Sequence, residues 1–317
     1  MRNKTVASNN SIEAIAKRQA ARRRNFKLTM LALPGILLLF VFNYLPMFGV
    51  VLAFKDFNPN RGIWGSEWVG FKNFEFFFKS QDAKRVIGNT VGYGLLFLIV
   101  DLIVAVTLAL MFYKLTSKKA LKVYNTVVIL PRFMSSVLVA FVAYLILSPS
   151  YGVLNSIIEA FGGEPISWYA DAKYWPWILT ITHIWQTMGM NCIIYYASLM
   201  SVDDNLLEAA AIDGANAWQQ IWNVLVPHLV PLMIINTILG IGSIFAGDFG
   251  LFYQTPKDVG LLYSTTDVIS TYTYRALQEG ALDKSAAVGL FQSIAGMIMV
   301  LITNGIARKV SPESSLF

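Results

Sequence analysis

The sequence predicts an all-α integral membrane protein with six transmembrane helices. Of its 317 residues, 56% are hydrophobic and 14% are charged, whereas an average soluble domain has about 45–50% apolar and about 25% charged residues. The apolar residues are concentrated in long blocks, and a helix needs about 20 such residues to cross the hydrocarbon core. The counts of Gly (22), Pro (11) and Cys (1) exclude collagen-like, disordered and disulfide-rich folds.

Six blocks are long and apolar enough to span a membrane. Three of them are free of charge, a fourth begins near Pro227 because the preceding residues are polar, and two hold one charge each, Asp101 and Arg132. The expected spans are 28–54, 87–113, 124–148, 175–200, 227–250 and 286–307. The predicted domain organisation is therefore a basic tail, a six-span transmembrane domain and a second tail, at residues 1–27, 28–307 and 308–317.

The distribution of charge predicts that both termini lie in the cytoplasm. In that orientation the inside segments hold more Lys and Arg than Asp and Glu, mainly at the N-terminus and in the loop 114–122. Basic residues beside a membrane span indicate anionic lipid headgroups as their partner, and not nucleic acid. One inside loop, 201–226, breaks the trend because it has four acids and no Lys or Arg.

That acidic loop predicts two short helices on the membrane surface. Asp203 or Asp204 caps the first helix, and Gly214 ends it in a left-handed conformation. The second has four apolar residues on one face, before Pro227 opens the fifth span: Trp218, Ile221, Trp222 and Leu225. A plain interfacial anchor is the alternative, but such anchors favour Lys and Arg on the polar face.

The same loop carries a recognisable motif. Glu208-Ala209-Ala210, three residues, Gly214, nine residues and Val224-Leu225-Val226-Pro227 resemble the EAA signature of permease subunits in binding-protein-dependent ABC importers. The family more often has Ile and Leu where the two valines stand. Asp-Gly-Ala at the turn is typical of the carbohydrate branch. The resemblance implies that residues 203–226 couple to an ATPase, chiefly through Glu208, Ala209, Ala210, Asp213, Gly214 and Ala215.

Glu208 has the most specific role in this comparison. The resemblance implies that the loop is a coupling helix seated in a cleft of an ATPase subunit, where Glu208 pairs with an Arg. The charge is consistent with this role, because the anionic inner leaflet would repel an acidic loop. A basic protein surface is the expected partner.

Further segments resemble the LplB-type polysaccharide and complex-sugar group of these permeases: 43–49, 53–57, 68–74, 130–136, 267–275 and 289–292. The resemblance implies a heterodimer with a second permease, two ATP-binding subunits and an extracytoplasmic solute-binding lipoprotein that delivers an oligosaccharide. It also implies that ATP and Mg are used by the partner subunits and that this chain binds no cofactor. An ABC permease for another small polar solute is the alternative.

Polar residues within spans predict a translocation path, because polar groups avoid lipid. The stripe in span four has i, i+3, i+4, i+7 spacing with Asn191 beside it: His183, Gln186, Thr187 and Met190. The stripe in span five has i, i+4, i+7, i+11 spacing: Asn236, Gly240, Ser243 and Gly247. Amides and hydroxyls suit sugar ligands. Helix packing is the alternative, above all for the two glycines.

The charged residues of the spans have two interpretations. Asp101 and Arg132 are expected to pair with each other, or Arg132 extends toward the inner headgroups. Asp248 closes span five, where a cap, a contact with the partner permease and a sugar contact all remain open.

The last outer loop provides the candidates for docking the binding protein, Tyr272, Tyr274 and Arg275. A second outer group contains Trp64, Trp68 and residues 74–78. This group is interpreted first as an interfacial aromatic belt and second as a docking face.

Other classes of protein lack support in the sequence. One Cys and two His cannot form a His/Cys zinc cluster. The chain has no G-x-S-x-G elbow and no Gly-Lys dipeptide, so we expect neither a membrane enzyme nor ATP hydrolysis by this chain. A secondary transporter is the remaining rival, but no inverted repeat is visible and Asp101 is the only acid in the middle of a span.

Overall fold

The computed structural model describes residues 25–310, and the chain divides into two compact units, residues 1–52 and 53–317. The first unit is dominated by the helix Asn25–Phe54, which reaches two residues into the second unit. This helix is wound as a π-helix over Phe40–Tyr44, as an α-helix over α2 (Leu45–Met47) and as a 3₁₀-helix over Phe48–Phe54. Pro46 lies where the π-helical segment passes into α2, and it cannot donate a helical hydrogen bond to the turn before it.

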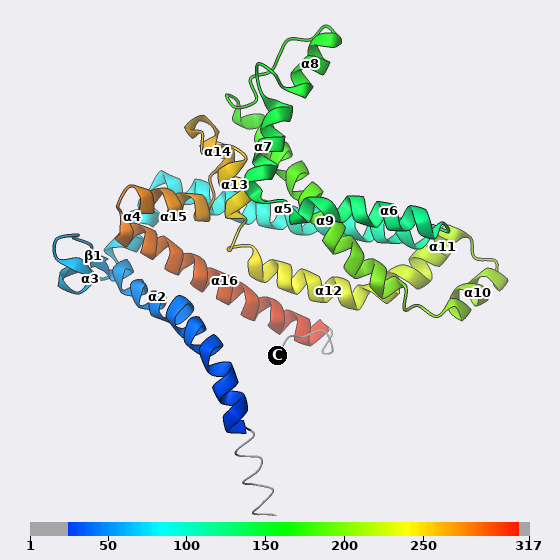
Figure 1. Cartoon of the computed structure of the whole chain (residues 1–317), viewed down its shortest axis with the longest axis horizontal. Coiled ribbons are helices and arrows are strands. Elements are labelled where there is room, and N and C mark those ends of the chain that lie inside the picture. The colour runs from blue at the N-terminus through cyan, green and yellow to red at the C-terminus, as the bar shows by residue number, and fades with distance from the viewer. Residues whose placement is uncertain (1–24, 311–317) are drawn as a thin grey trace, which may run out of the picture. The chain divides into compact units, whose positions relative to one another are not determined.

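The second unit is helical apart from one β-ribbon (Figure 1). In chain order its elements are β1 (Lys55–Asp56), α3 (Gly62–Gly65), β2 (Glu67–Trp68), α4 (Lys72–Lys79), α5 (Gln81–Tyr113), α6 (Lys118–Ile129), α7 (Ser136–Leu147), α8 (Val153–Ala160), α9 (Trp175–Leu199), α10 (Asp204–Ile212), α11 (Ala217–Gln220), α12 (Val226–Ser243), α13 (Phe249–Gln254), α14 (Tyr263–Thr266), α15 (Ile269–Gln278) and α16 (Leu282–Val310). The strands β1 and β2 are antiparallel, with Lys55 opposite Trp68.

Four helices in the described part of the chain are long and apolar enough to cross a membrane: Asn25–Phe54, Gln81–Tyr113, Ala217–Ser243 and Leu282–Ile306. They correspond to the first, second, fifth and sixth expected spans. The fourth expected span forms the 25-residue helix α9, whose His, Gln, Asn and Thr residues lower its hydropathy. The all-α membrane fold is confirmed, and the number of six spans stays a prediction.

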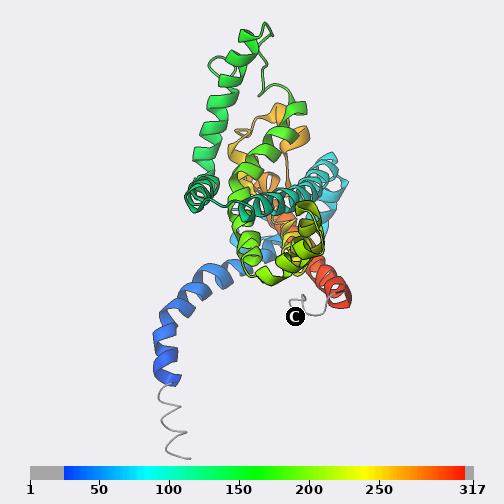
Figure 2. The same ribbon diagram turned by 90° about the vertical axis from the view of Figure 1, so that its right-hand side faces the viewer.

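The third expected span, 124–148, is sharply bent in the structure, which the sequence analysis did not foresee. Two helical segments, Lys118–Phe133 and Ser136–Leu147, meet at 104°, so that α7 leaves the direction of α6 (Figures 1 and 2). Pro131 lies in a 3₁₀ turn at the end of the first segment and cannot donate a helical hydrogen bond. Ser135 is extended and its hydroxyl accepts from the N–H of Leu138 at 3.3 Å, which starts a new helix.

The fifth span begins earlier than predicted. The helix Ala217–Ser243 is continuous, so the second short helix of the acidic loop does not end before Pro227. Residues Ile221–Leu225 are wound as a π-helix, and the N–H of Val226 reaches back to the carbonyl of Ile221. A π turn changes the hydrogen-bond register, which lets the helix pass Pro227 without a break.

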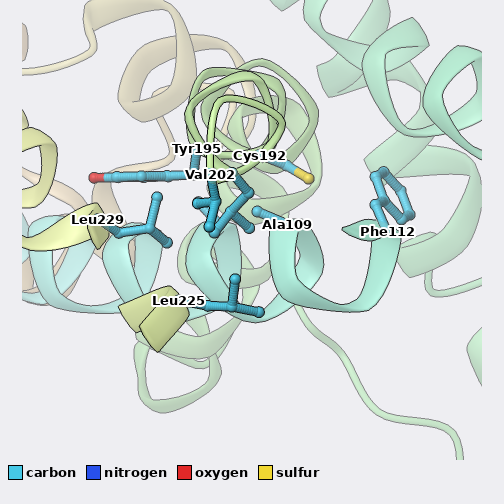
Figure 3. Packing of buried hydrophobic residues seen from close by; sticks show 9 residues of the cluster. Ala109, Phe112, Cys192, Tyr195, Val202, Leu225 and Leu229 are labelled. Atoms are coloured by element: carbon cyan, nitrogen blue, oxygen red, sulfur yellow. The ribbon is translucent and has the colours of Figure 1, made fainter. Parts of the chain in front are cut away.

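The longest contact between helices joins α5 and α9. At one end of this pair, Ala109 and Phe112 of α5 pack with Cys192 and Tyr195 of α9 and with Leu225 before α12 (Figure 3). At the other end a second buried cluster contains Trp175, Leu179 and Leu262. A third cluster ties α4, α15 and α16 together through Phe77, Ile269 and Val288.

Gly189 permits the close approach of α9 to α6. A Cβ atom placed there would lie 2.2 Å from the carbonyl oxygen of Val128, which is backbone and cannot turn aside. We expect Gly189→Ala to destabilise the protein by about 1–3 kcal/mol and to lower its thermal unfolding midpoint in detergent. Gly88→Ala is the matched control, because a Cβ there meets nothing within 4 Å and Ala favours a helix. Equal midpoints for the two variants would contradict the proposed contact.

Candidate functional site

A cavity of about 360 Å³ lies among α5, α9, α12 and the segment that follows α12. Its wall is mixed, with aromatic and aliphatic side chains between polar ones. The polar side chains include Thr90, Asp101, His183, Asn191, Asn236 and Ser243. A concave site of this kind, with a few converging polar groups, is the usual form of a small-molecule site.

Asp101 is the central charged group of this wall. Its carboxylate lies 3.0 Å from Nε2 of His183 and accepts from the hydroxyl of Thr187 at 2.8 Å. The Phe97 ring stacks on the imidazole, with centroids 3.9 Å apart and the planes 7° from parallel. The side chains of Asp101 and His183 stay 22% and 13% exposed, so the pair is held firmly but can still be reached from the cavity.

The expected ion pair between Asp101 and Arg132 is therefore wrong. His183 and Thr187 hold the carboxylate, and the side chain of Arg132 is exposed in the 3₁₀ turn after α6. Hydrophobic periodicity places residues around each helix, but it does not say which neighbouring helix faces Asp101. Sequence reasoning did not assign Asp101 to the path, although its position as the only acid in the middle of an expected span was a signal.

The cavity gathers only part of the predicted path. His183, Asn191, Asn236, Gly240 and Ser243 line it. Thr187 is tied to it through the hydroxyl that binds Asp101. Gln186 and Met190 do not line it, because the wall follows the i, i+4, i+8 row of α9 whereas the predicted stripe was wider.

The structure also bears on the alternatives left open for Gly240, Gly247 and Asp248, namely packing or capping on one side and a place in the path on the other. Gly240 lines the cavity and also allows packing, since a Cβ there would lie 2.4 Å from Cδ1 of Leu98 on α5. Gly247 has a φ of 63°, which favours glycine. The carboxylate of Asp248 accepts from the N–H of Leu251 at 3.0 Å and so caps α13, while Asp248 also lines the cavity.

The acidic loop folds largely as its local signals predicted. The side chain of Asp203 accepts from the N–H of Asn205 at 3.0 Å and caps α10. Gly214 ends α10 with a φ of 81°, and the N–H of Ala215 returns to the carbonyl of Ala210 at 2.9 Å. α11 then begins with a reciprocal capping box between Asn216 and Gln219.

This loop presents an unpaired acidic and apolar surface. Glu208 is exposed and the side chain of Ile212 is 86% exposed. Trp218 and Trp222 are also exposed and lie edge to face, with centroids 5.7 Å apart. Leu225 anchors the loop in the buried cluster of Figure 3. In Figure 1, α10 and α11 lie at one end of the helices and α4 and α15 at the other.

The predicted docking residues lie on α15, and all three are partly buried by contacts within the chain. Tyr272 packs against Phe77, with centroids 5.5 Å apart. Tyr274 forms an aromatic group with Phe249 and Tyr253, at 4.9 Å from each. Arg275 is engaged inside the chain, so its charge is already balanced.

The partners of Arg275 form a network at this end of the molecule. Its guanidinium binds Asp258 at 2.9 Å and also binds Asp267, whose fully buried carboxylate is 2.9 Å from Arg85 on α5. The guanidinium also lies 4.0 Å from the ring centre of Tyr263. Burial alone would lower the pKa of Arg275, but its carboxylate partners outweigh this effect and raise the pKa.

Metal chemistry has no candidate in the described residues. Within residues 25–310, no group of three or more His, Cys, Asp or Glu side chains is arranged to hold an ion. The single cysteine, Cys192, is buried in the α5–α9 cluster.

Membrane-spanning helices around a polar cavity define a membrane transport component. Residues 101–314 match the family described as "Binding-protein-dependent transport system inner membrane component". The chain belongs to this family, whose members are membrane permeases of ABC importers and not enzymes. The resemblance to these permeases is thereby confirmed.

Two relatives from Bacillus subtilis (strain 168) are similar over most of their length. Protein LplB is 34% identical over 295 residues, which cover 93% of this chain and 92% of LplB. The polygalacturonan/rhamnogalacturonan transport system permease protein YteP is 33% identical over 291 residues, 90% of this chain and 89% of YteP.

A solved structure is also similar. It is the crystal structure of a bacterial ABC transporter involved in the import of the acidic polysaccharide alginate. The matched chain superposes with a TM-score of 0.83 and 32% sequence identity, over 91% of this chain and 97% of that chain. A second structure of the bacterial alginate transporter, in complex with an alginate pentasaccharide-bound periplasmic protein, gives a TM-score of 0.82.

Proposed function

We propose that this chain is a permease subunit of an ATP-driven importer for oligosaccharides or complex carbohydrates delivered by an extracytoplasmic solute-binding protein. Family membership supports the transport class. The names of several relatives support carbohydrate as the cargo, since they refer to polygalacturonan, arabinooligosaccharides and products of starch degradation. The proposed partners are a second permease and two ATP-binding subunits, which bind the ATP and Mg.

The exposed acidic helix α10 is the observation that carries the ATP-driven part of this proposal. Glu208 and Ile212 face outward from a loop whose other side is anchored in the core. A partner with an Arg and an apolar cleft would satisfy both side chains. The loop 203–226 would then pass the closing movement of the ATP-binding subunits to α9 and α12, because it connects these two helices.

The cavity is suited to a saccharide. Sugar hydroxyl groups both donate and accept, and the wall offers the amides of Asn191 and Asn236 and the hydroxyl of Ser243. Tyr93, Phe97 and Phe252 provide apolar ring surface. In the proposed cycle, rocking of the helices opens this cavity alternately to the two sides of the membrane.

The proposed orientation places both termini in the cytoplasm of the bacterial cell. It is supported by the lysines at the junction of α5 and α6, which lies at the same end of the helices as α10 (Figure 1): Lys114 after α5 and Lys118, Lys119 and Lys122 in the first turns of α6. The predicted tails, 1–27 and 308–317, lie mostly outside the described residues. We propose that the solute-binding lipoprotein docks at the opposite end, against Tyr272 and Tyr274, with Arg275 holding α15 in place.

The cavity assignment is tested by replacing one amide inside it and one outside it. We expect Asn236→Leu to reduce uptake of the transported sugar by about tenfold or more, because a buried sugar hydroxyl then lacks a partner. Gln186→Leu, the matched control on the neighbouring stripe, should transport close to the wild-type rate. Uptake is measured in proteoliposomes with the assembled transporter, and assembly with the ATP-binding subunits is checked by co-purification. Normal kinetics for Asn236→Leu would remove the cavity from the path.

A further inference from the structure

The charges of the cavity wall are all of one sign except for a single imidazole. Among the described residues that line it, Asp101 and Asp248 carry carboxylates, and there is no Lys or Arg. The remaining titratable groups on the wall are the imidazole of His183 and the phenols of Tyr93 and Tyr195. A phenol is ordinarily neutral near pH 7, so only the imidazole can add a positive charge.

His183 cannot make the wall positive. When it is protonated, its charge is balanced by Asp101 at 3.0 Å, and Asp248 still leaves the cavity with negative charge. When it is neutral, both carboxylates are uncompensated. The cavity is therefore net negative in either protonation state of the imidazole, with both carboxylates ionised.

Asp101 also retains capacity to bind hydroxyl groups. An ionised carboxylate has about four acceptor positions on its two oxygens. His183 and Thr187 each use one, and the side chain stays partly exposed. Hydrogen bonds from hydroxyls to a carboxylate are among the stronger ones, so a neutral sugar finds a good acceptor here.

An acidic sugar meets the opposite situation. A uronate carboxylate entering this cavity would lose water without finding a cation, and burial of an unpaired charge is costly. It would also lie beside a like charge in a region of low dielectric constant. The same carboxylate that accepts from a sugar hydroxyl thus rejects a sugar acid.

We infer that this chain's half of the path selects uncharged saccharides over uronate-bearing ones, with Asp101 as the specificity-determining residue. This inference rests on the proposed function. A neutral cargo would differ from that of the similar solved transporter. That transporter, to which this chain is 32% identical, is involved in the import of the acidic polysaccharide alginate. Overall similarity would favour an acidic cargo, whereas the local charges of this cavity favour a neutral one.

The test compares two sugars that differ only in their carboxyl groups. The purified transporter, assembled with its permease and ATP-binding partners but without the binding protein, is titrated with an α-1,4-linked trigalacturonate and with its carboxyl-reduced neutral counterpart. We expect the neutral sugar to bind about tenfold more tightly or better. Asp101→Asn should reduce this difference to about threefold or less by improving uronate binding, whereas Asp101→Glu should keep it.

The control is Glu159→Gln, which removes an exposed acid on α8 outside the cavity and should leave the wild-type preference unchanged. If Asp101→Asn does not fold, the wild-type comparison alone still decides. Equal or tighter binding of trigalacturonate by the wild type would overturn the charge selectivity and leave the proposed function standing. Binding of neither sugar would overturn the cavity as a sugar path, and this inference with it.

Discussion

Glu208→Lys is expected to reduce sugar uptake by about a hundredfold or more while the chain still inserts and remains in the membrane. Glu208 is exposed on α10, so its replacement does not disturb the core. If the side chain meets an Arg of an ATP-binding subunit, the substitution places two positive charges together, and such contacts cost several kcal/mol. ATP hydrolysis should then no longer respond to the sugar-loaded binding protein. Uptake and stimulated hydrolysis are both measured in proteoliposomes.

The matched control for this variant is Glu159→Lys. Glu159 is also an exposed helical acid, but it lies on α8 and not on the α10 surface. We expect wild-type uptake from the control and normal amounts of both variants in the membrane. Wild-type uptake by Glu208→Lys would show that this residue makes no contact needed for coupling.

Asp267→Ala is expected to destabilise the protein by about 3–5 kcal/mol. The buried carboxylate of Asp267 binds Arg275 and Arg85 and accepts from the hydroxyl of Thr271 at 2.9 Å. Its removal leaves two guanidinium groups without their shared partner, which joins α5 to α15. This loss is a large part of the roughly 5–15 kcal/mol that stabilises a typical protein. Thermal unfolding in detergent provides the measurement.

The control for this second variant is Asp171→Ala, which removes the exposed ion pair with Lys173. Exposed pairs contribute little, so its unfolding midpoint should stay close to that of the wild type. An Asp267→Ala protein as stable as this control would contradict the structural role of the network.

The features predicted most accurately from the sequence are local ones. The cap at Asp203 and the left-handed turn at Gly214 depend on residues within a few positions of each other, and the EAA-like motif lies within one loop. The bend between α6 and α7 was missed because Pro131 alone does not define it. The bend also needs the extended backbone of Met134 and Ser135 and the hydroxyl of Ser135, which caps the new helix.

The cavity was only half predictable. Periodicity placed His183 and Asn236 on polar stripes, and both line the cavity. Periodicity does not determine which face of α5 lies against α9. The sequence analysis therefore expected Asp101 to pair with Arg132, whereas its partner in the structure is His183. For the same reason, the predicted stripe on α9 included Gln186 and Met190, which do not line the cavity. Contacts between distant segments, unlike caps and turns, have no signal in a single sequence.

The most direct test of the account is cross-linking from α10 to an ATP-hydrolysing partner. Ile212→Cys places a thiol at a position that is 86% exposed, and the only natural cysteine, Cys192, is buried. In membranes that contain the assembled transporter, this variant should cross-link to the ATP-binding subunit and resist membrane-impermeant thiol reagents added from outside the cell. The control Tyr151→Cys, at an exposed position between α7 and α8, should not cross-link to that subunit. Labelling of Ile212→Cys from outside the cell, or no cross-link to an ATP-hydrolysing protein, would contradict the coupling role of α10.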